Sequence, residues 1–154
     1  MARSILLDTD VLVDFFRGYS KAVAFVNANS ARLILSSIVV AELYAGVKGD
    51  AEQATLENFI SLFRVIPVSA EIARAGGLYK RDYGKSHGVG LADAILAATA
   101  EAENAELKTL NIEHYPMIIE WVEWGERGSG QDNYIEPLMI TRNNGDICPL
   151  YRTF

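Results

Sequence analysis

Four polar residues of this 154-residue chain lie at the ends of, or within the first turns of, elements that are otherwise apolar. They are Asp8 after the apolar run 5–7, Glu42 within 38–43, Asp93 within 91–98, and Asn111 after the strand-like run 107–110. Two carboxylates about 4 Å apart repel each other by roughly 4 kcal/mol at an effective dielectric near 20. A divalent cation removes this repulsion, and Mg²⁺ and Mn²⁺ prefer hard oxygen ligands. These residue types therefore predict a metal-dependent hydrolase that acts on phosphodiesters.

The pattern that must position these residues alternates short apolar runs with amphipathic segments. Strands are predicted at 5–7, 32–36, 64–68 and 106–110. Helices are predicted at 11–17, 22–29, 52–63, 70–83 and 91–104, with a further helix that carries Glu42, and a glycine-rich loop is predicted at 84–90. Such alternation is typical of an α/β fold with a parallel sheet, in which ligands bind at the carboxyl ends of the strands. All four polar residues are expected at that end.

Each of the four also has an interpretation without chemistry. The alternatives are a turn and helix N-cap for Asp8-Thr9-Asp10, a surface position for Glu42, a helix-dipole interaction for Asp93 and a simple turn for Asn111. The shared end of the predicted sheet favours a common site over these separate explanations.

Composition limits the remaining function classes. A net charge of −6 argues against a protein that coats nucleic acid by bulk attraction, so any RNA contact needs a local basic patch. The densest basic cluster is the predicted RNA-binding patch, with a solvated helix face as the alternative; it comprises Arg74, Lys80, Arg81, Lys85 and His87. The single cysteine, Cys148, cannot form an internal disulfide, and no apolar run reaches about 18 residues. The cytoplasm, without membrane attachment, is the expected location.

Four segments in order resemble the motifs of PIN domain (PilT N-terminus) ribonucleases, the last in the form common among VapC-type toxins. They are residues 8–14, 37–46, 91–100 and 109–116. The resemblance implies a central parallel sheet of about four strands flanked by helices, and a Mg²⁺ or Mn²⁺ site. A PIN-like nuclease domain is expected at 1–118. An irregular C-terminal extension is expected at 119–154, with a short strand near 135–140 interrupted by Pro137.

The resemblance also assigns roles to individual residues. It implies that Asp8, Glu42 and Asp93 form the catalytic and metal-binding triad. Four further residues are expected in support: Thr9, Asp10, which either adds a carboxylate or fixes the loop, Thr109, whose hydroxyl would lie near the cluster, and Asn111, where many members have Asp. Because an amide brings no charge to a metal, a strong second metal site is not expected. His114 is expected to be structural.

The predicted function is that of a metal-dependent endoribonuclease, the toxin of a type II toxin–antitoxin pair and a homodimer. An antitoxin segment is expected to cover apolar faces at 52–63 and 22–26 and to offer Arg or Lys to the acidic site, although both faces could instead form the core. Two other functions stay open. One is a haloacid-dehalogenase-like phosphatase with Asp8 as nucleophile, although the residues after Gly145-Asp146 lack its closing Asp. The other is a PIN-like binding module with an idle site.

Overall fold

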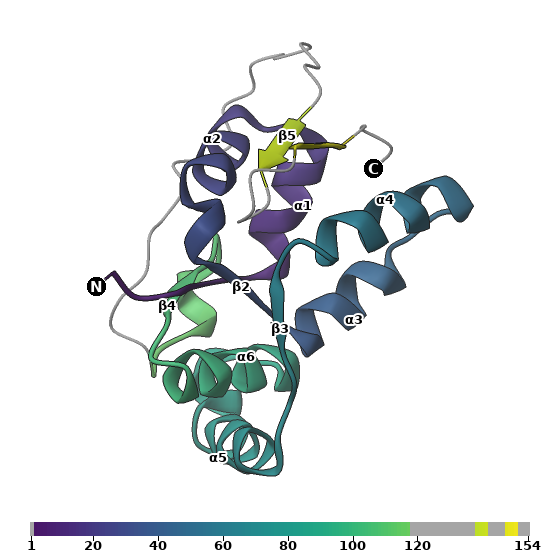
Figure 1. Cartoon of the computed structure of the whole chain (residues 1–154). Coiled ribbons are helices and arrows are strands. Elements are labelled where there is room, and N and C mark those ends of the chain that lie inside the picture. Colours follow the sequence, from purple (N-terminus) through teal and green to yellow (C-terminus); the bar gives the residue numbers. More distant parts are fainter. Residues whose placement is uncertain (1, 118–137, 142–146, 151–154) are drawn as a thin grey trace.

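A four-stranded parallel sheet forms the centre of the molecule (Figure 1). The computed structural model of the chain describes residues 2–117, 138–141 and 147–150. The strand order is β3-β2-β1-β4, and the strands are β1 (Ile5–Leu7), β2 (Leu33–Ser36), β3 (Arg64–Ile66) and β4 (Glu106–Lys108). Ile5 pairs with Leu33 on one side and with Glu106 on the other. The predicted parallel sheet is confirmed, with strands at the expected positions.

Helices connect the strands and cover the sheet. The first four are α1 (Thr9–Arg17), α2 (Ser20–Asn29), α3 (Ser37–Ala45) and α4 (Asp50–Ile60). They are followed by α5 (Ala70–His87) and α6 (Leu91–Ala102), and two 3₁₀ turns lie at Ser30–Arg32 and Ile112–His114. In Figure 1, α1 and α2 lie on one side of the strands and α5 and α6 on the other, while α3 and α4 extend to a third side. Within the described residues, no helix is long and apolar enough to cross a membrane.

Local sequence explains where these helices begin and end. The side chain of Asp8 caps α1 by accepting from the Thr9 amide, and Gly18 ends that helix with a φ of 78°. Ser36 caps α3 in the same way, which places Glu42 in its second turn. The segment 84–87, predicted as part of a glycine-rich loop, is instead the last turn of α5. That prediction was wrong because the helix continues through Gly84 to a left-handed C-cap at Gly88, where φ is 65°.

The apolar faces of 52–63 and 22–26 belong to the core. Phe59 is fully buried, and its ring centroid lies 5.3 Å from that of Phe15 and 4.9 Å from those of Phe16 and Phe63. Val26 is also fully buried. Burial of each such side chain contributes about 1.5–3 kcal/mol, so core packing explains the apolar pattern. The expectation that these faces form an exposed docking surface was wrong.

Two further strands lie in the C-terminal part of the chain. β5 (Leu138–Thr141) and β6 (Ile147–Leu150) pair as an antiparallel ladder with Ile140 opposite Cys148. The predicted strand at 135–140 thus overlaps β5, which begins directly after Pro137. The rest of the predicted extension 119–154 lies outside the described residues, and its separation as a unit stays a prediction.

Candidate active site

Asp8 lies where β1 ends at the carboxyl edge of the sheet. Its backbone N–H donates to the carbonyl of Lys108 at 2.9 Å, which extends the β1–β4 pairing by one residue. Its side chain is only 7% exposed and accepts three hydrogen bonds. The donors are the Thr9 amide at 2.7 Å, the Thr109 hydroxyl at 2.8 Å and the Tyr115 hydroxyl at 2.6 Å. The carboxylate is therefore fixed from both neighbouring elements.

Asp10 lies beside Asp8 at the same edge. One of its oxygens accepts from the Val11 amide at 2.7 Å, and the other accepts from the Leu110 amide at 3.1 Å. The Thr109 hydroxyl is also 3.4 Å from that second oxygen. Asp10 thus joins α1 to the segment after β4, so it fixes the loop and also adds a carboxylate to the cluster.

Burial and mutual repulsion weaken the acidity of both carboxyl groups. Burial raises the pKa of Asp8, although the hydrogen bonds from Tyr115 and Thr109 oppose the rise. Burial, followed by repulsion from Asp8, raises the pKa of Asp10 to about 7. A bound cation would favour the ionised form of both groups.

Asp93 approaches Asp8 from the opposite side, in the first turn of α6. One of its oxygens lies 3.1 Å from the Tyr115 hydroxyl, and the other lies 2.9 Å from Nδ1 of His114. The side-chain nitrogen of Asn111 in turn lies 3.3 Å from Nε2 of His114. Asn111 therefore contacts the cluster through His114 and has no hydrogen bond to an acidic side chain among those of the described residues.

His114 and Tyr115 contact the acidic cluster, which the sequence analysis did not predict. His114 contacts Asp93 directly, and its structural role stays a prediction. Tyr115 is fully buried. The sequence pattern around it gave no sign that its hydroxyl would lie between two carboxylates. The available signal was their position inside the last motif, three and four residues after Asn111.

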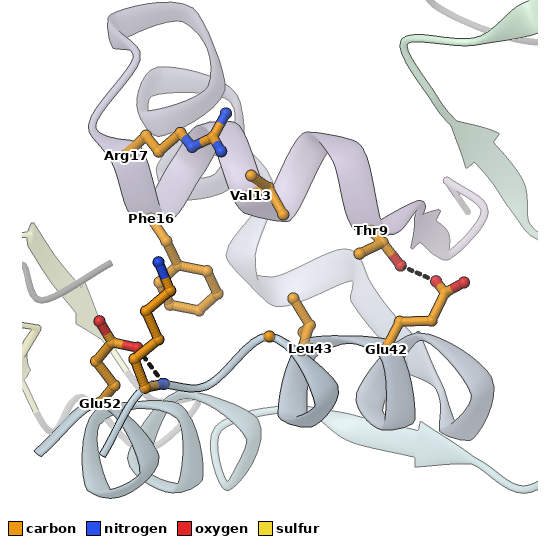
Figure 2. A pocket seen from close by; sticks show the side chains of 9 residues that line it. Thr9, Val13, Phe16, Arg17, Glu42, Leu43 and Glu52 are labelled. Carbon is orange, nitrogen blue, oxygen red and sulfur yellow. Dashed lines mark hydrogen bonds between the residues drawn. The ribbon is translucent and has the colours of Figure 1, made fainter. Parts of the chain in front are cut away.

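Glu42 occupies the other end of the candidate site. It is exposed on α3, and its carboxylate accepts a hydrogen bond from the Thr9 hydroxyl. Figure 2 shows these two side chains at one end of a pocket of about 270 Å³ between α1 and α3. The lining also includes the apolar side chains of Val13, Phe16 and Leu43, and the cations Arg17 and Lys48. Thr9, which lies between Asp8 and Asp10 in the sequence, therefore links Glu42 to these two residues by its hydrogen bond.

The predicted basic cluster lies on α5. Arg74, Arg81 and Lys85 are exposed and recur at spacings of seven and four residues, so they share a helix face. Arg81 also pairs with Asp82 at 2.8 Å. Lys80 instead donates to the carbonyl of Val89 at 2.7 Å, in the short connection before α6. His87 packs its ring against Tyr83 at the end of α5.

The donor chemistry of the cluster fits a hard divalent cation. Asp8 and Asp93 both lie within hydrogen-bond distance of the Tyr115 hydroxyl, which lies between their carboxylates. Carboxylate oxygens of this kind are ligands for Mg²⁺ or Mn²⁺. Within the part of the chain that the structure describes, no three Asp, Glu, His or Cys side chains are close enough together to hold an ion. Glu42 is therefore not grouped with Asp8 and Asp93 in the structure, and the predicted triad stays a prediction.

Comparison with known proteins agrees with this architecture. The model of the PIN domain family matches residues 5–115. Two curated relatives from Mycobacterium tuberculosis each align over 116 residues, or 73% of this chain. Ribonuclease VapC10 is 37% identical with 86% of its length covered, and Ribonuclease VapC19 is 39% identical with 92% covered.

Solved structures share the fold. A toxin–antitoxin complex from Klebsiella pneumoniae gives a TM-score of 0.65 at 29% identity, covering 77% of this chain and 96% of that one. A DNA-bound VapBC from Salmonella typhimurium gives a TM-score of 0.69 at 23% identity, covering 80% and 99%. The second likeness supports the fold alone.

Proposed function

This chain belongs to the PIN domain family, and from that premise we propose that it is a divalent-metal-dependent endoribonuclease, the toxin of a toxin–antitoxin pair. One observation carries the proposal: Asp8 and Asp93 converge on a single point at the carboxyl end of a parallel sheet. This arrangement occurs in a chain that is 37% and 39% identical to two ribonucleases.

Asp8, Asp93 and Glu42 would hold the ion, and Mg²⁺ or Mn²⁺ suits their oxygens. When bound, such an ion polarises a phosphoryl oxygen and lowers the pKa of a coordinated water. The protein itself supplies orientation, because Thr9, Thr109 and backbone amides hold the acidic side chains. In the metal-free protein burial raises the pKa of Asp10 to about 7, and a bound ion would favour its ionised form.

The substrate is RNA, and α5 offers the cations that an acidic protein needs for its phosphates. Arg74, Arg81 and Lys85 are exposed on one face, and His87 lies at the end of the helix that leads toward Asp93. Lys80 has a different role, because its bond to Val89 fixes the connection before α6. We therefore expect Arg74 and Lys85 to affect RNA affinity and Lys80 to affect the placement of Asp93.

The partner is an antitoxin, and the pocket beside Glu42 is its proposed point of entry. The solved structures that share the fold include a toxin–antitoxin complex from Klebsiella pneumoniae. A basic side chain from the antitoxin would pair with Glu42 while apolar neighbours contact Val13 and Leu43. We also propose that the protein is a homodimer in the cytoplasm. Its nuclease domain would span residues 1–118, followed by an extension at 119–154.

The phosphatase alternative gains no support from the comparisons, because the family model that matches residues 5–115 is that of the PIN domain.

Cleavage assays test the proposed function directly. Purified protein should cut RNA with Mg²⁺ or Mn²⁺ and lose the activity in EDTA, and Asp93→Asn should be inactive under both conditions. Full cleavage in EDTA, or by Asp93→Asn, would contradict it. Co-purification from the native host with mass measurement tests the partner: a free, active monomer whose overexpression leaves growth unaffected would refute the toxin role alone.

A further inference from the structure

Tyr115 lies between two carboxylates that come from different layers of the fold. Its side chain is fully buried, and its hydroxyl oxygen lies 2.6 Å from Oδ2 of Asp8 and 3.1 Å from Oδ1 of Asp93. Asp8 ends a strand and Asp93 opens a helix 85 residues later, so local backbone geometry cannot fix their separation. Among the hydrogen bonds of the described residues, those of Tyr115 alone reach both groups.

The neighbouring residue holds the other oxygen of Asp93. Nδ1 of His114 lies 2.9 Å from Oδ2 of Asp93, and in the tautomer protonated at Nδ1 the ring donates to that oxygen. The side-chain nitrogen of Asn111 lies 3.1 Å from Nδ1 and 3.3 Å from Nε2 of the same ring. His114 and Tyr115 thus contact the two oxygens of Asp93, while the single Tyr115 hydroxyl proton is donated along the shorter contact, to Asp8.

We propose that Tyr115 is a positioning residue, whose hydroxyl sets the placement of Asp8 relative to Asp93 before a divalent ion arrives. The inference rests on the proposed function. Without the hydroxyl, two carboxylates would face each other with no donor between them, and their repulsion would turn them apart. Outer partners of ligating groups typically change metal affinity by 10–100-fold when removed. His114 assists by limiting rotation of the Asp93 carboxylate.

Tyr115→Phe isolates the hydroxyl, because the buried ring is kept. The matched control is Tyr79→Phe, because Tyr79 also donates its hydroxyl to a carboxylate, that of Glu101, on the outer side of α5 and α6. Calorimetric titration of Mn²⁺ into each full-length protein measures affinity without any need for cleavage. We expect Tyr115→Phe to bind Mn²⁺ about 10–100-fold more weakly than wild type, and Tyr79→Phe to bind it as wild type does.

Equal or tighter binding by Tyr115→Phe would overturn the inference, and so would equal weakening in both variants. If Tyr115→Phe failed to fold by circular dichroism, His114→Ala would decide, because His114 is 38% exposed at its side chain. Weaker Mn²⁺ binding by that variant supports the positioning role, and unchanged binding overturns it. Wild-type protein that binds no Mn²⁺ or Mg²⁺ would overturn the proposed metal dependence together with the inference.

Discussion

The two ends of the candidate site are built in opposite ways. At one end, Asp8 is 7% exposed and accepts three hydrogen bonds, and nearby Asp93 is held through both of its oxygens. At the other end, Glu42 is exposed, and Thr9 is its one described hydrogen-bond partner. The buried end is fixed before any ligand binds, whereas the exposed end is free to reorient. We therefore expect metal affinity to depend on the buried end, and binding of RNA or a partner to depend on Glu42.

The largest effect should come from removal of the most tightly held carboxylate. Asp8→Asn removes a charge. It also places an amide N–H₂ against the hydrogen-bond donors that point at the Asp8 carboxylate in the wild-type protein. RNA cleavage and Mn²⁺ affinity should fall by more than the roughly 10–100-fold expected for loss of an outer partner. Cleavage rates and calorimetry measure both. Asp50→Asn, at the exposed start of α4, is the charge-matched control, and wild-type activity in Asp8→Asn would contradict the assignment.

Metal addition should stabilise the buried end measurably. At a hundredfold excess over Kd, a ligand that binds only the folded state adds about 2.7 kcal/mol to the free energy of unfolding. Urea unfolding with and without Mn²⁺ should show this gain in wild type. The gain should vanish in Asp8→Asn, and its persistence there would place the ion elsewhere.

The rigidity of the buried end also depends on how closely α5 approaches α6. A Cβ built at Gly76 would lie 2.9 Å from the Cα of Ile95, in the helix that carries Asp93. Gly76→Ala should therefore cost about 1–3 kcal/mol through overpacking. Gly77→Ala is the matched control, because no atom lies within 4 Å of its Cβ and alanine favours a helix. Equal stability of the two variants in urea unfolding would refute the close approach.

The pH dependence of stability reports on Asp10. The folded state keeps the Asp10 proton up to about pH 7, whereas the ordinary pKa of an aspartate is 3.8. The folded state binds more protons in this window, so the stability from this group is present below pH 4 and lost as pH rises toward 7. In metal-free protein, Asp10→Asn should lack this part of the decline. The unfolding free energies of wild type and variant, measured from pH 4 to 7, should therefore differ in slope, and parallel curves would contradict the shift.

The smallest effect on stability should come from the exposed end. Glu42→Gln should change the metal-free unfolding free energy by no more than about 0.5 kcal/mol, as exposed substitutions usually do. The same variant should lose cleavage if Glu42 completes the metal site. A large loss of stability in Glu42→Gln would contradict the difference in rigidity between the two ends of the candidate site.

Sequence patterns predicted the sheet, because continuous apolar runs such as 5–7 and 33–35 are typical of strands buried on both faces. They also predicted that Asp8 and Asp93 share one end of it. They did not predict that Tyr115 would point its hydroxyl at both, since a buried tyrosine and a buried phenylalanine give the same pattern. The end of α5 was missed because Gly84 and Gly88 look alike in sequence, and only Gly88 has a positive φ.

The edge position of β4 has a consequence for the timing of biosynthesis. Thr109 and Tyr115 reach Asp8 across 101 and 107 residues, and β4 is the last strand of the parallel sheet to be made. A nascent chain that ends before Glu106 contains Asp8, Glu42 and Asp93 but lacks the hydroxyls that orient Asp8. At about 5–20 residues per second, the missing residues follow within roughly two seconds. The acidic site is therefore completed only when the last strand of the parallel sheet has been made. Until then, the translating ribosome is not exposed to a finished nuclease.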